Sequence, residues 1–189
     1  MQDDKLHGRF AALPDQKPVD PVRVALSWVR TLFFAALLAF FIIRFVVVNA
    51  SVVSGSMERT IMTGDRVICS RLTYRVRDPE RFDVIAFDHH QGEASWIYVK
   101  RIIGLPGERL EIINGLVYIN DTPLCEPFIN SRPPGSYGPF YIPDGHFFVL
   151  GDNRHASYDS KDWPDPFLAR EQILGRAIFT YYPRINRIE

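Results

Sequence analysis

Three short polar stretches of the sequence carry side chains that could perform nucleophilic chemistry. The stretch 54–57 (SGSM) offers two hydroxyl groups just after a long apolar segment. Lys100 interrupts the apolar stretch 95–105 (SWIYVKRIIGL), and the stretch 151–161 (GDNRHASYDSK) follows the apolar run HFFVL. A serine hydroxyl becomes an effective nucleophile when an adjacent base takes its proton, so these stretches matter together only if the fold brings them into contact.

Lys100 is the candidate base. Apolar neighbours that desolvate a lysine lower its pKa from ~10.4 toward neutrality, and the uncharged amine can then deprotonate a serine. The alternative is an outward-facing lysine on a half-buried strand, in alternation with Tyr98. Likewise, 54–57 could be an ordinary loop, and 151–161 could be a turn capped by its own Asp and Asn side chains.

A long apolar segment precedes these stretches. Residues 31–48 contain a single charge, Arg44, and an α-helix of ~20 residues crosses the ~30 Å hydrocarbon layer of a membrane. A cleavable signal peptide would lie nearer the start of the chain with a shorter apolar core, and a buried core helix would not need to be apolar all round. The segment therefore predicts a transmembrane anchor.

Basic residues set the expected orientation of this anchor. Five Lys or Arg residues lie among the first 30 positions, whereas the first cation after the segment, apart from Arg44, is Arg59. The positive-inside rule then places the N-terminus in the cytoplasm. We expect a cytoplasmic tail over 1–22, a transmembrane anchor over 23–48 and an extracytoplasmic domain over 49–189.

The extracytoplasmic part has the pattern of β-structure. Apolar or alternating runs separated by turn residues predict strands, and Asn114-Gly115 between two such runs predicts a hairpin. We expect a compact, mainly β and mostly antiparallel domain, with a Pro- and Gly-rich insertion around 121–144 and one short helix over 167–174. The predicted strands lie within 65–76, with Val67, Cys69 and Leu72 facing inward, and within 82–87, 95–105, 109–120, 145–153 and 175–183.

Composition excludes some classes of protein. The chain has 189 residues with 22 basic and 22 acidic side chains, and this zero net charge argues against nucleic acid as a partner. A hydrophobic content of 47% argues against disorder. Cys69 and Cys125 would face an oxidising compartment, which allows a disulfide without requiring one, and no Cys/His cluster suggests a metal site.

The motifs SGSM, YVKRIIGLPGE (98–108) and GDNRHASYDSK, in this order after an N-terminal anchor, resemble those of bacterial type I signal peptidases (leader peptidases), which are Ser-Lys dyad proteases. The similarity covers roughly residues 30–183. It implies a membrane-bound serine endopeptidase that removes N-terminal signal peptides from exported preproteins at the outer face of the cell's inner (plasma) membrane. Its partners would be signal peptides and the lipid bilayer, it would need neither metal nor cofactor, and its oligomeric state stays open.

The resemblance also implies a role for individual residues. Ser56 is the expected nucleophile and Lys100 the expected general base. Ser54 would join the Ser56 backbone N–H as an oxyanion hole, and Ser157 would orient the lysine. The residues implied to support the site are Arg101, Asp152, Asn153, Arg154, Asp159 and Lys161. Those implied to line the substrate cleft are Val52, Val53, Met57, Tyr98 and Val99.

The chain departs from the family pattern at several positions. Val53 and Arg59 stand where proline is usual, and His155-Ala156 replaces Asp-Asn. Lys161 replaces arginine, which predicts a single-point ion pair and a less rigid loop. None of these changes removes a group expected to transfer a proton.

Three rival interpretations remain at this stage. The first is a Ser-Lys protease dedicated to a conjugation or secretion substrate. The second is a non-catalytic, membrane-tethered β domain for binding, which predicts that Ser54, Ser56, Lys100 and Ser157 are scattered in space. The third is a Ser-His-Asp triad that uses His155.

Overall fold

The computed structural model describes residues 20–91, 94–129 and 131–188. Two units are distinguished by their internal packing, Met1–Phe40 and Phe41–Glu189. The tail expected over 1–22 lies almost entirely outside the described residues.

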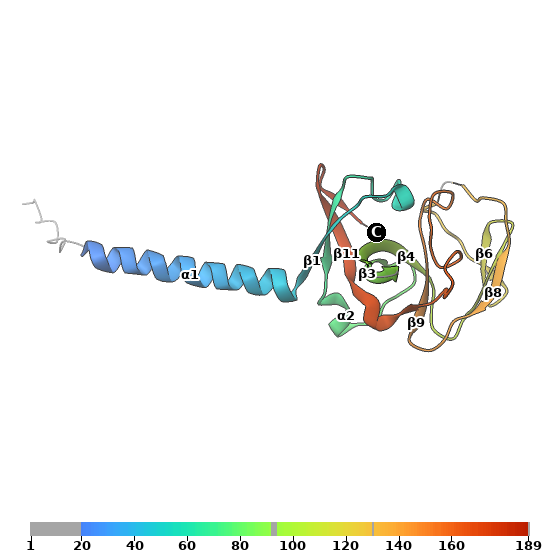
Figure 1. Cartoon of the computed structure of the whole chain (residues 1–189), viewed down its shortest axis with the longest axis horizontal. Helices are drawn as coiled ribbons and strands as arrows, with labels where there is room; N and C mark the ends of the chain where they lie inside the picture. Colours follow the sequence, from blue (N-terminus) through green and yellow to red (C-terminus); the bar gives the residue numbers. More distant parts are fainter. Residues whose placement is uncertain (1–19, 92–93, 130, 189) are drawn as a thin grey trace, which may run out of the picture. The chain divides into compact units, whose positions relative to one another are not determined.

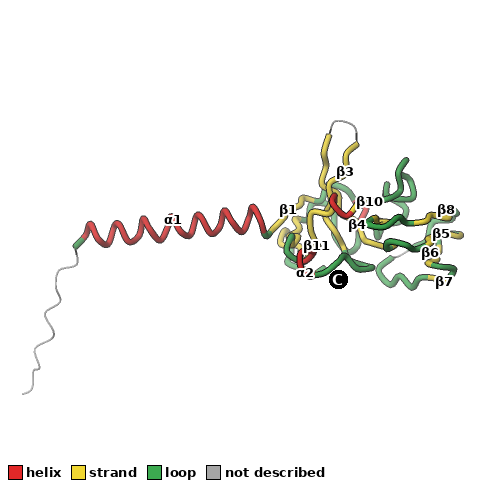
Figure 2. The backbone as a smooth tube through the Cα atoms, turned by 90° about the horizontal axis from the view of Figure 1, so that it is seen from below, coloured by secondary structure: helices red, strands yellow, loops and turns green. Residues whose placement is uncertain are grey.

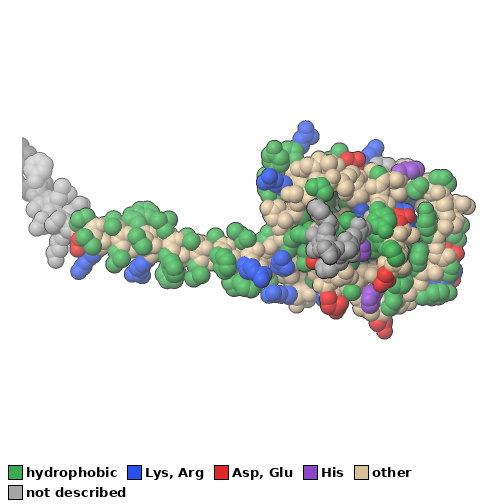
Figure 3. Space-filling view, viewed as in Figure 1, with side chains coloured by type: hydrophobic (Ala, Val, Ile, Leu, Met, Phe, Trp, Pro, Cys, Tyr) green, Lys and Arg blue, Asp and Glu red, His purple; other side chains and the backbone are tan. Residues whose placement is uncertain are grey.

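The apolar segment forms one helix, α1 (Pro21–Phe45) (Figure 1). Asp20 accepts a hydrogen bond from the Val22 backbone N–H at 3.0 Å, and Pro21 occupies the first turn, where its missing N–H costs nothing. None of the helix residues is buried, and hydrophobic side chains cover much of it in Figure 3. Its 25 residues give a length of about 37 Å, long enough to span a hydrocarbon layer.

The helix ends earlier than the expected boundary at residue 48. Val47 and Val48 belong instead to strand β1 (Val47–Ser51), which pairs with β2 (Arg66–Ser70) from Val47↔Ser70 to Ser51↔Arg66. Three consecutive valines at 46–48 favour extended backbone, and Val47 and Val48 pair with Ser70 and Cys69 of β2.

The part of the chain after α1 is built from two antiparallel sheets, which confirms the expected mainly β fold. The larger has the order β1-β2-β11-β3-β4-β9-β10, with β12 on β11, and the smaller has the order β7-β6-β5-β8. Figure 2 shows the smaller sheet at one end of this domain and β1 and β11 at the other. The remaining strands of the larger sheet are β3 (Val84–Gln91), β4 (Ala94–Gly104), β9 (His146–Leu150), β10 (Leu168–Ala169), β11 (Ile173–Tyr182) and β12 (Asn186–Arg187). Those of the smaller sheet are β5 (Arg109–Ile113), β6 (Leu116–Ile119), β7 (Thr122–Pro123) and β8 (Tyr137–Tyr141).

Several local expectations are confirmed. Asn114 and Gly115 have φ values of 50° and 78° and join β5 to β6, as a two-residue hairpin turn with both central residues left-handed requires. Residues 84–87 are buried on both faces of β3, with exposures of 2% or less. Val67 and Cys69 are fully buried, as predicted.

Other local expectations are wrong. Leu72 is 41% exposed, because the strand ends at Ser70 and the chain turns into the short helix α2 (Thr73–Val76). The helix expected over 167–174 is only a single 3-10 turn, η2 (Arg170–Gln172), between two strands. Leu168 pairs with Phe147 of β9, and this tertiary pairing overrides the helical pattern of the sequence.

The segment 121–144 is not simply an insertion. It contributes β7 and β8 to the smaller sheet, and Ile142 within it is 3% exposed. The glycine and proline in β8 (YGPFY) are unfavourable in strands, so the sequence did not predict a strand here. Pairing with β5 stabilises it. Cys69 and Cys125 are both free, so the disulfide that the sequence allowed is not formed, and burial raises the pKa of the Cys69 thiol to about 12.

Candidate active site

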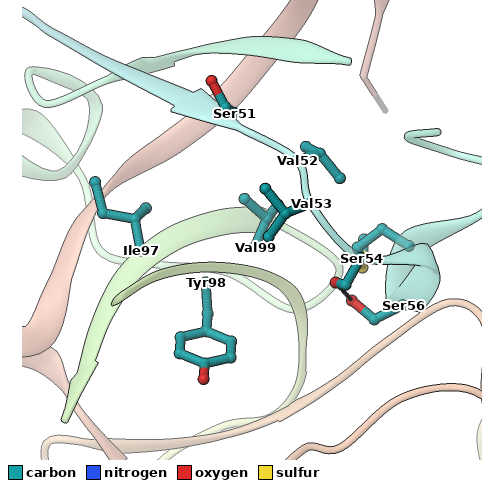
Figure 4. Close-up of a pocket in the computed structure, with 9 residues that line it drawn as sticks. Ser51, Val52, Val53, Ser54, Ser56, Ile97, Tyr98 and Val99 are labelled. Atoms are coloured by element: carbon teal, nitrogen blue, oxygen red, sulfur yellow. Dashed lines mark hydrogen bonds between the residues drawn. The ribbon is translucent and has the colours of Figure 1, made fainter. Parts of the chain in front are cut away.

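A cavity of about 250 Å³ lies between the chain that follows β1 and the middle of β4. It is lined by the segment 51–54, by Ser56 and Met57 of the 3-10 turn η1 (Gly55–Met57), and by the segment 97–99 of β4. All five residues predicted for the substrate cleft are among them, while Ser51 and Ile97 were not predicted. In Figure 4, Tyr98 points away from Val99, as strand alternation requires.

Ser56 sits in η1, where its side chain is largely buried and its Oγ lies 3.3 Å from Ser54 Oγ (Figure 4). The turn is anchored from the loop that follows β9. The Asn153 backbone N–H donates to the Ser56 carbonyl at 3.0 Å, and the Asn153 side-chain amide donates to the Gly55 carbonyl at 3.0 Å. Asn153 therefore fixes the two peptide groups on either side of the Ser56 Cα atom, one of which contains the Ser56 N–H.

Lys100 follows the lining residues Tyr98 and Val99 in β4 and is only 2% exposed. The interpretation as an outward-facing lysine is therefore wrong. Its Nζ donates to Ser157 Oγ at 2.9 Å. Burial lowers the pKa of Lys100 from 10.5 to about 8, although the nearby Asp159 carboxylate acts in the opposite direction. Near neutral pH, part of the Lys100 population is therefore uncharged and able to accept a proton.

Ser157 is held by two charged residues of its own loop. Its hydroxyl donates to Asp159 Oδ2 at 2.5 Å, so its oxygen is free to accept from Lys100. Lys161 Nζ donates to Asp159 Oδ1 at 3.0 Å, to the Ser157 carbonyl at 3.0 Å and to Asp162 Oδ2 at 2.7 Å. Lys161 thus meets Asp159 at a single oxygen, as the replacement of arginine by lysine predicts, and its two other donors bind the Ser157 carbonyl and Asp162.

A second ion pair, through Asp152, connects β4 to the chain that follows η1. Arg101 donates to both carboxylate oxygens of Asp152, at 2.9 and 2.7 Å, and both side chains are almost fully buried. Thr60 Oγ1 donates to Asp152 Oδ2 at 2.5 Å from the chain just after η1. Thr60 was not predicted, because a threonine in a loop carries no distinctive sequence pattern.

Gly151 brings the two serines of the site together. A Cβ atom on Gly151 would lie 2.3 Å from Ser157 Oγ and 2.5 Å from the Ser56 carbonyl oxygen. Such distances are well inside van der Waals contact, so only glycine fits between these two residues. Ser56, Ser157 and Lys100 are therefore neighbours, contrary to the scattering that a non-catalytic domain predicts.

Within the described residues, Ser56 and Lys100 do not hydrogen-bond to each other directly, since Ser56 Oγ pairs with Ser54 and Lys100 Nζ with Ser157. Catalytic hydrogen bonds are often absent or long in substrate-free enzymes. His155 is exposed, and among the described residues it makes no hydrogen bond to Ser56. The same residues contain no group of three or more His, Cys, Asp or Glu side chains placed to hold a metal ion.

Comparison with known proteins identifies relatives along most of the chain. Residues 25–182 match the family described as signal peptidase, peptidase S26. A probable signal peptidase I-2 of Synechocystis sp. is 38% identical over 172 residues, which cover 89% of this chain and 78% of that protein. A signal peptidase I of Leptolyngbya laminosa is 38% identical over 168 residues, or 85% and 80% of the two chains. A probable chloroplastic thylakoidal processing peptidase 2 of Arabidopsis thaliana is 36% identical over 140 residues, or 70% and 37%.

The matched residues include all three motifs, and the class of protein is that of the serine endopeptidases. The chain belongs to the signal peptidase family, peptidase S26. The resemblance seen in the motifs is thereby confirmed, and the interpretation as a non-catalytic binding domain is wrong.

Proposed function

We propose that this chain removes N-terminal signal peptides from exported preproteins, with Ser56 as nucleophile and Lys100 as general base. The observation that carries the assignment is the buried Lys100 amine, which lies 2.9 Å from Ser157 Oγ and has a lowered pKa. Among the described residues, no carboxylate hydrogen-bonds to this amine. A desolvated lysine in such surroundings is costly to maintain, and catalysis by its neutral form accounts for its presence.

The proposed reaction proceeds through an acyl-enzyme. Substrate binding separates Ser56 from Ser54, and Ser56 Oγ transfers its proton to the neutral Lys100 amine as it attacks the scissile carbonyl carbon. The negative charge that develops on the carbonyl oxygen is stabilised by the Ser56 backbone N–H and the Ser54 hydroxyl. Lys100 then returns the proton to the leaving amine, and the C–N bond breaks. In the second half, Lys100 deprotonates a water molecule as its oxygen attacks the ester carbonyl carbon. The bond between that carbon and Ser56 Oγ then breaks, and Lys100 returns the proton to Ser56 Oγ.

The cavity beside Ser56 supports a substrate with small side chains near the cut. Its walls include Val52, Val53, Met57 and Val99, which present apolar surface without a charged group to bind a charged side chain. Signal peptides carry small residues at the first and third positions before the cut, in an Ala-X-Ala pattern. We infer that these two side chains occupy this cavity.

We also propose that α1 anchors the enzyme in the bilayer, with the N-terminus in the cytoplasm and the β domain outside. Its length and apolar surface support the anchor, and the excess of cations before it supports the orientation. Ser56 follows the end of α1 by only eleven positions. The membrane proposed is the inner (plasma) membrane. Since relatives include thylakoidal peptidases, fractionation of the cells would test it against the thylakoid.

The proposed function is tested with the full chain in lipid vesicles and a purified preprotein. We expect one cut, mapped by mass spectrometry, directly after the Ala-X-Ala sequence. Replacing the alanine before the cut by tryptophan should stop it. Complementation of a strain depleted of its own signal peptidase would separate a general enzyme from one dedicated to a conjugation or secretion substrate. Growth supports the general enzyme, and failure to grow despite cleavage of one substrate supports the dedicated one.

A further inference from the structure

The loop 151–161 is held by a short segment that plays no part in the mechanism above, Glu126-Pro127-Phe128, just after β7. Glu126 forms a two-point ion pair with Arg154, in which Nη1 donates to Oε2 at 3.2 Å and Nη2 donates to Oε1. Exposure of the two side chains is 0% for Glu126 and 4% for Arg154. This carboxylate is therefore buried and committed to an arginine of the catalytic loop.

Phe128, two residues later, contacts the other arginine of the site. The Arg101 guanidinium carbon lies 4.1 Å from the centre of the Phe128 ring, a cation–π distance. Arg101 directly follows Lys100 and binds Asp152 at the same time. One tripeptide thus contacts both arginines that flank the catalytic groups.

A continuous chain of hydrogen bonds connects Glu126 to Lys100. Arg154, besides binding Glu126, donates from Nε to the Gly151 carbonyl at 3.1 Å. The Gly151 backbone N–H donates to Asp159 Oδ2 at 3.0 Å, and the same oxygen accepts from Ser157, the partner of Lys100. None of the residues 126–128 lines the cavity beside Ser56.

We propose that Glu126 and Phe128 are positioning residues for catalysis. They hold the Ser157 hydroxyl and the Lys100 amine at the correct positions relative to Ser56. This inference rests on the proposed role of Lys100 as general base. The segment acts through Arg154 and Arg101 and touches neither substrate nor the reacting atoms.

Burial of an ion pair does not by itself account for Glu126. Buried ion pairs are frequently no more stabilising than well-packed apolar residues of similar size, because desolvation offsets the attraction. Their directional hydrogen bonds do fix geometry, and the Glu126 pair fixes the loop at Arg154, next to Gly151 and Ser157. A geometric role in the site therefore explains both the residue type and its location.

The test compares Glu126→Gln with the matched variant Glu108→Gln. Glu108 forms a similar two-point pair with Arg81, at 3.0 and 2.5 Å, away from the catalytic loop. We expect Glu126→Gln to lower kcat for a preprotein about 10- to 100-fold with KM changed less than about twofold, since small misplacements of reacting groups have such effects. Glu108→Gln should keep the wild-type kcat and lower only the melting temperature.

The pH profile separates positioning from simple loss of fold. Lys100 is surrounded by the charges of Asp159, Lys161, Asp152 and Asp162. In Glu126→Gln, a loosened loop would admit water to the Lys100 amine and favour its charged form. The pKa of Lys100 would then rise, and the acid limb of the kcat profile would move to higher pH. A variant that is merely less stable would keep the wild-type limb.

Two further variants complete the design. Glu126→Asp retains the charge and should recover much of the kcat, and Phe128→Leu retains apolar volume and should lower kcat with an unchanged KM. Ser56→Ala and Lys100→Met in the same assay test the proposed mechanism itself. Activity in either would reject that mechanism and with it the premise of this inference, whereas inactive Ser56→Ala and Lys100→Met variants leave Glu126→Gln to test the inference alone. Wild-type kcat and pH profile in the folded Glu126→Gln and Phe128→Leu variants would overturn the inference, as would a complete failure of these variants to fold.

Discussion

Lys100 Nζ donates a hydrogen bond to Ser157 Oγ at 2.9 Å, and the Ser157 hydroxyl is itself directed at Asp159. This arrangement leaves Ser157 as an acceptor toward the lysine. An uncharged amine that donates one N–H to Ser157 keeps its lone pair off Ser157, so the lone pair remains available to accept a proton. The same hydrogen bond also helps to satisfy a polar group that is buried within the domain.

Ser157→Ala removes this orienting acceptor. We expect kcat for a preprotein to fall on the order of 10²-fold, because a general base acts efficiently only in the correct geometry. Ser160→Ala is the matched control, since Ser160 is also buried in the same loop but accepts from the Val149 N–H. It should cost about 1–3 kcal/mol of stability and keep its kcat. Equal kcat in both variants would reject the orienting role of Ser157.

The pH dependence of activity follows from the pKa of Lys100. Since burial lowers this pKa to about 8, the active neutral amine is lost as the pH falls below that value. We expect kcat/KM to rise through pH 8 with a single proton lost and to become negligible in acid. An acid limb near the ordinary pKa of histidine, together with loss of activity in His155→Ala, would contradict the assignment.

The same shift has a consequence for stability. The folded pKa of Lys100 lies below its unfolded value of 10.5, so the folded state binds the proton less tightly, and stability increases as the pH rises from about 8 to 10.5. Lys100→Met removes the cost of burying a charge and should stabilise the protein at pH 7 by about 2–3 kcal/mol. Denaturant unfolding at pH 7 and pH 11 measures this difference, which should disappear at the higher pH. An equal difference at both values would exclude a lowered pKa.

Gly151 should not tolerate a larger residue. In Gly151→Ala the new methyl group would meet Ser157 Oγ at 2.3 Å and the Ser56 carbonyl at 2.5 Å, and it would push the two serines apart. We expect kcat to fall by at least about 10²-fold. Gly145→Ala is the control, because Gly145 has a φ of 71° but nothing within 4 Å of a Cβ. It should lose about 1 kcal/mol of stability without loss of kcat.

Ser54 should increase kcat because its hydroxyl stabilises the oxyanion of the transition state. Removing one oxyanion-hole donor typically costs ~10²–10³ in kcat, and Ser54→Ala should show such a loss with little change in KM. Ser54→Thr, which keeps a hydroxyl, should recover part of it. A Ser54→Ala variant with wild-type kcat would remove Ser54 from the oxyanion hole.

The sequence predicts the strands well where its own pattern is strong. The apolar run over 82–87 predicts a buried strand and Asn114-Gly115 predicts a hairpin turn, and the structure confirms both. The motifs identify the family. It fails where tertiary pairing decides the conformation. Residues 167–174 become strands and a 3-10 turn because β9 and β3 pair with them, and β8 forms despite its glycine and proline.

The candidate site shows the same division. Ser56, Lys100 and Ser157 are predicted from their motifs, and the structure brings them together around Gly151. Thr60 and Glu126 could not be predicted, because their importance depends on Asp152 and Arg154, which lie far away in the sequence. No local pattern of residues encodes such a contact.

The central claim is that Lys100 takes the proton of Ser56, and preprotein cleavage by Lys100→Met tests it most directly. The assay uses the full chain in lipid vesicles at pH 8.5 (roughly the upper side of the expected titration), with Ser56→Ala as the background. Circular dichroism and a cooperative melting curve must show that the variant is folded. If Lys100 is the general base, Lys100→Met should cut no faster than Ser56→Ala. Cleavage at or near the wild-type rate would contradict it.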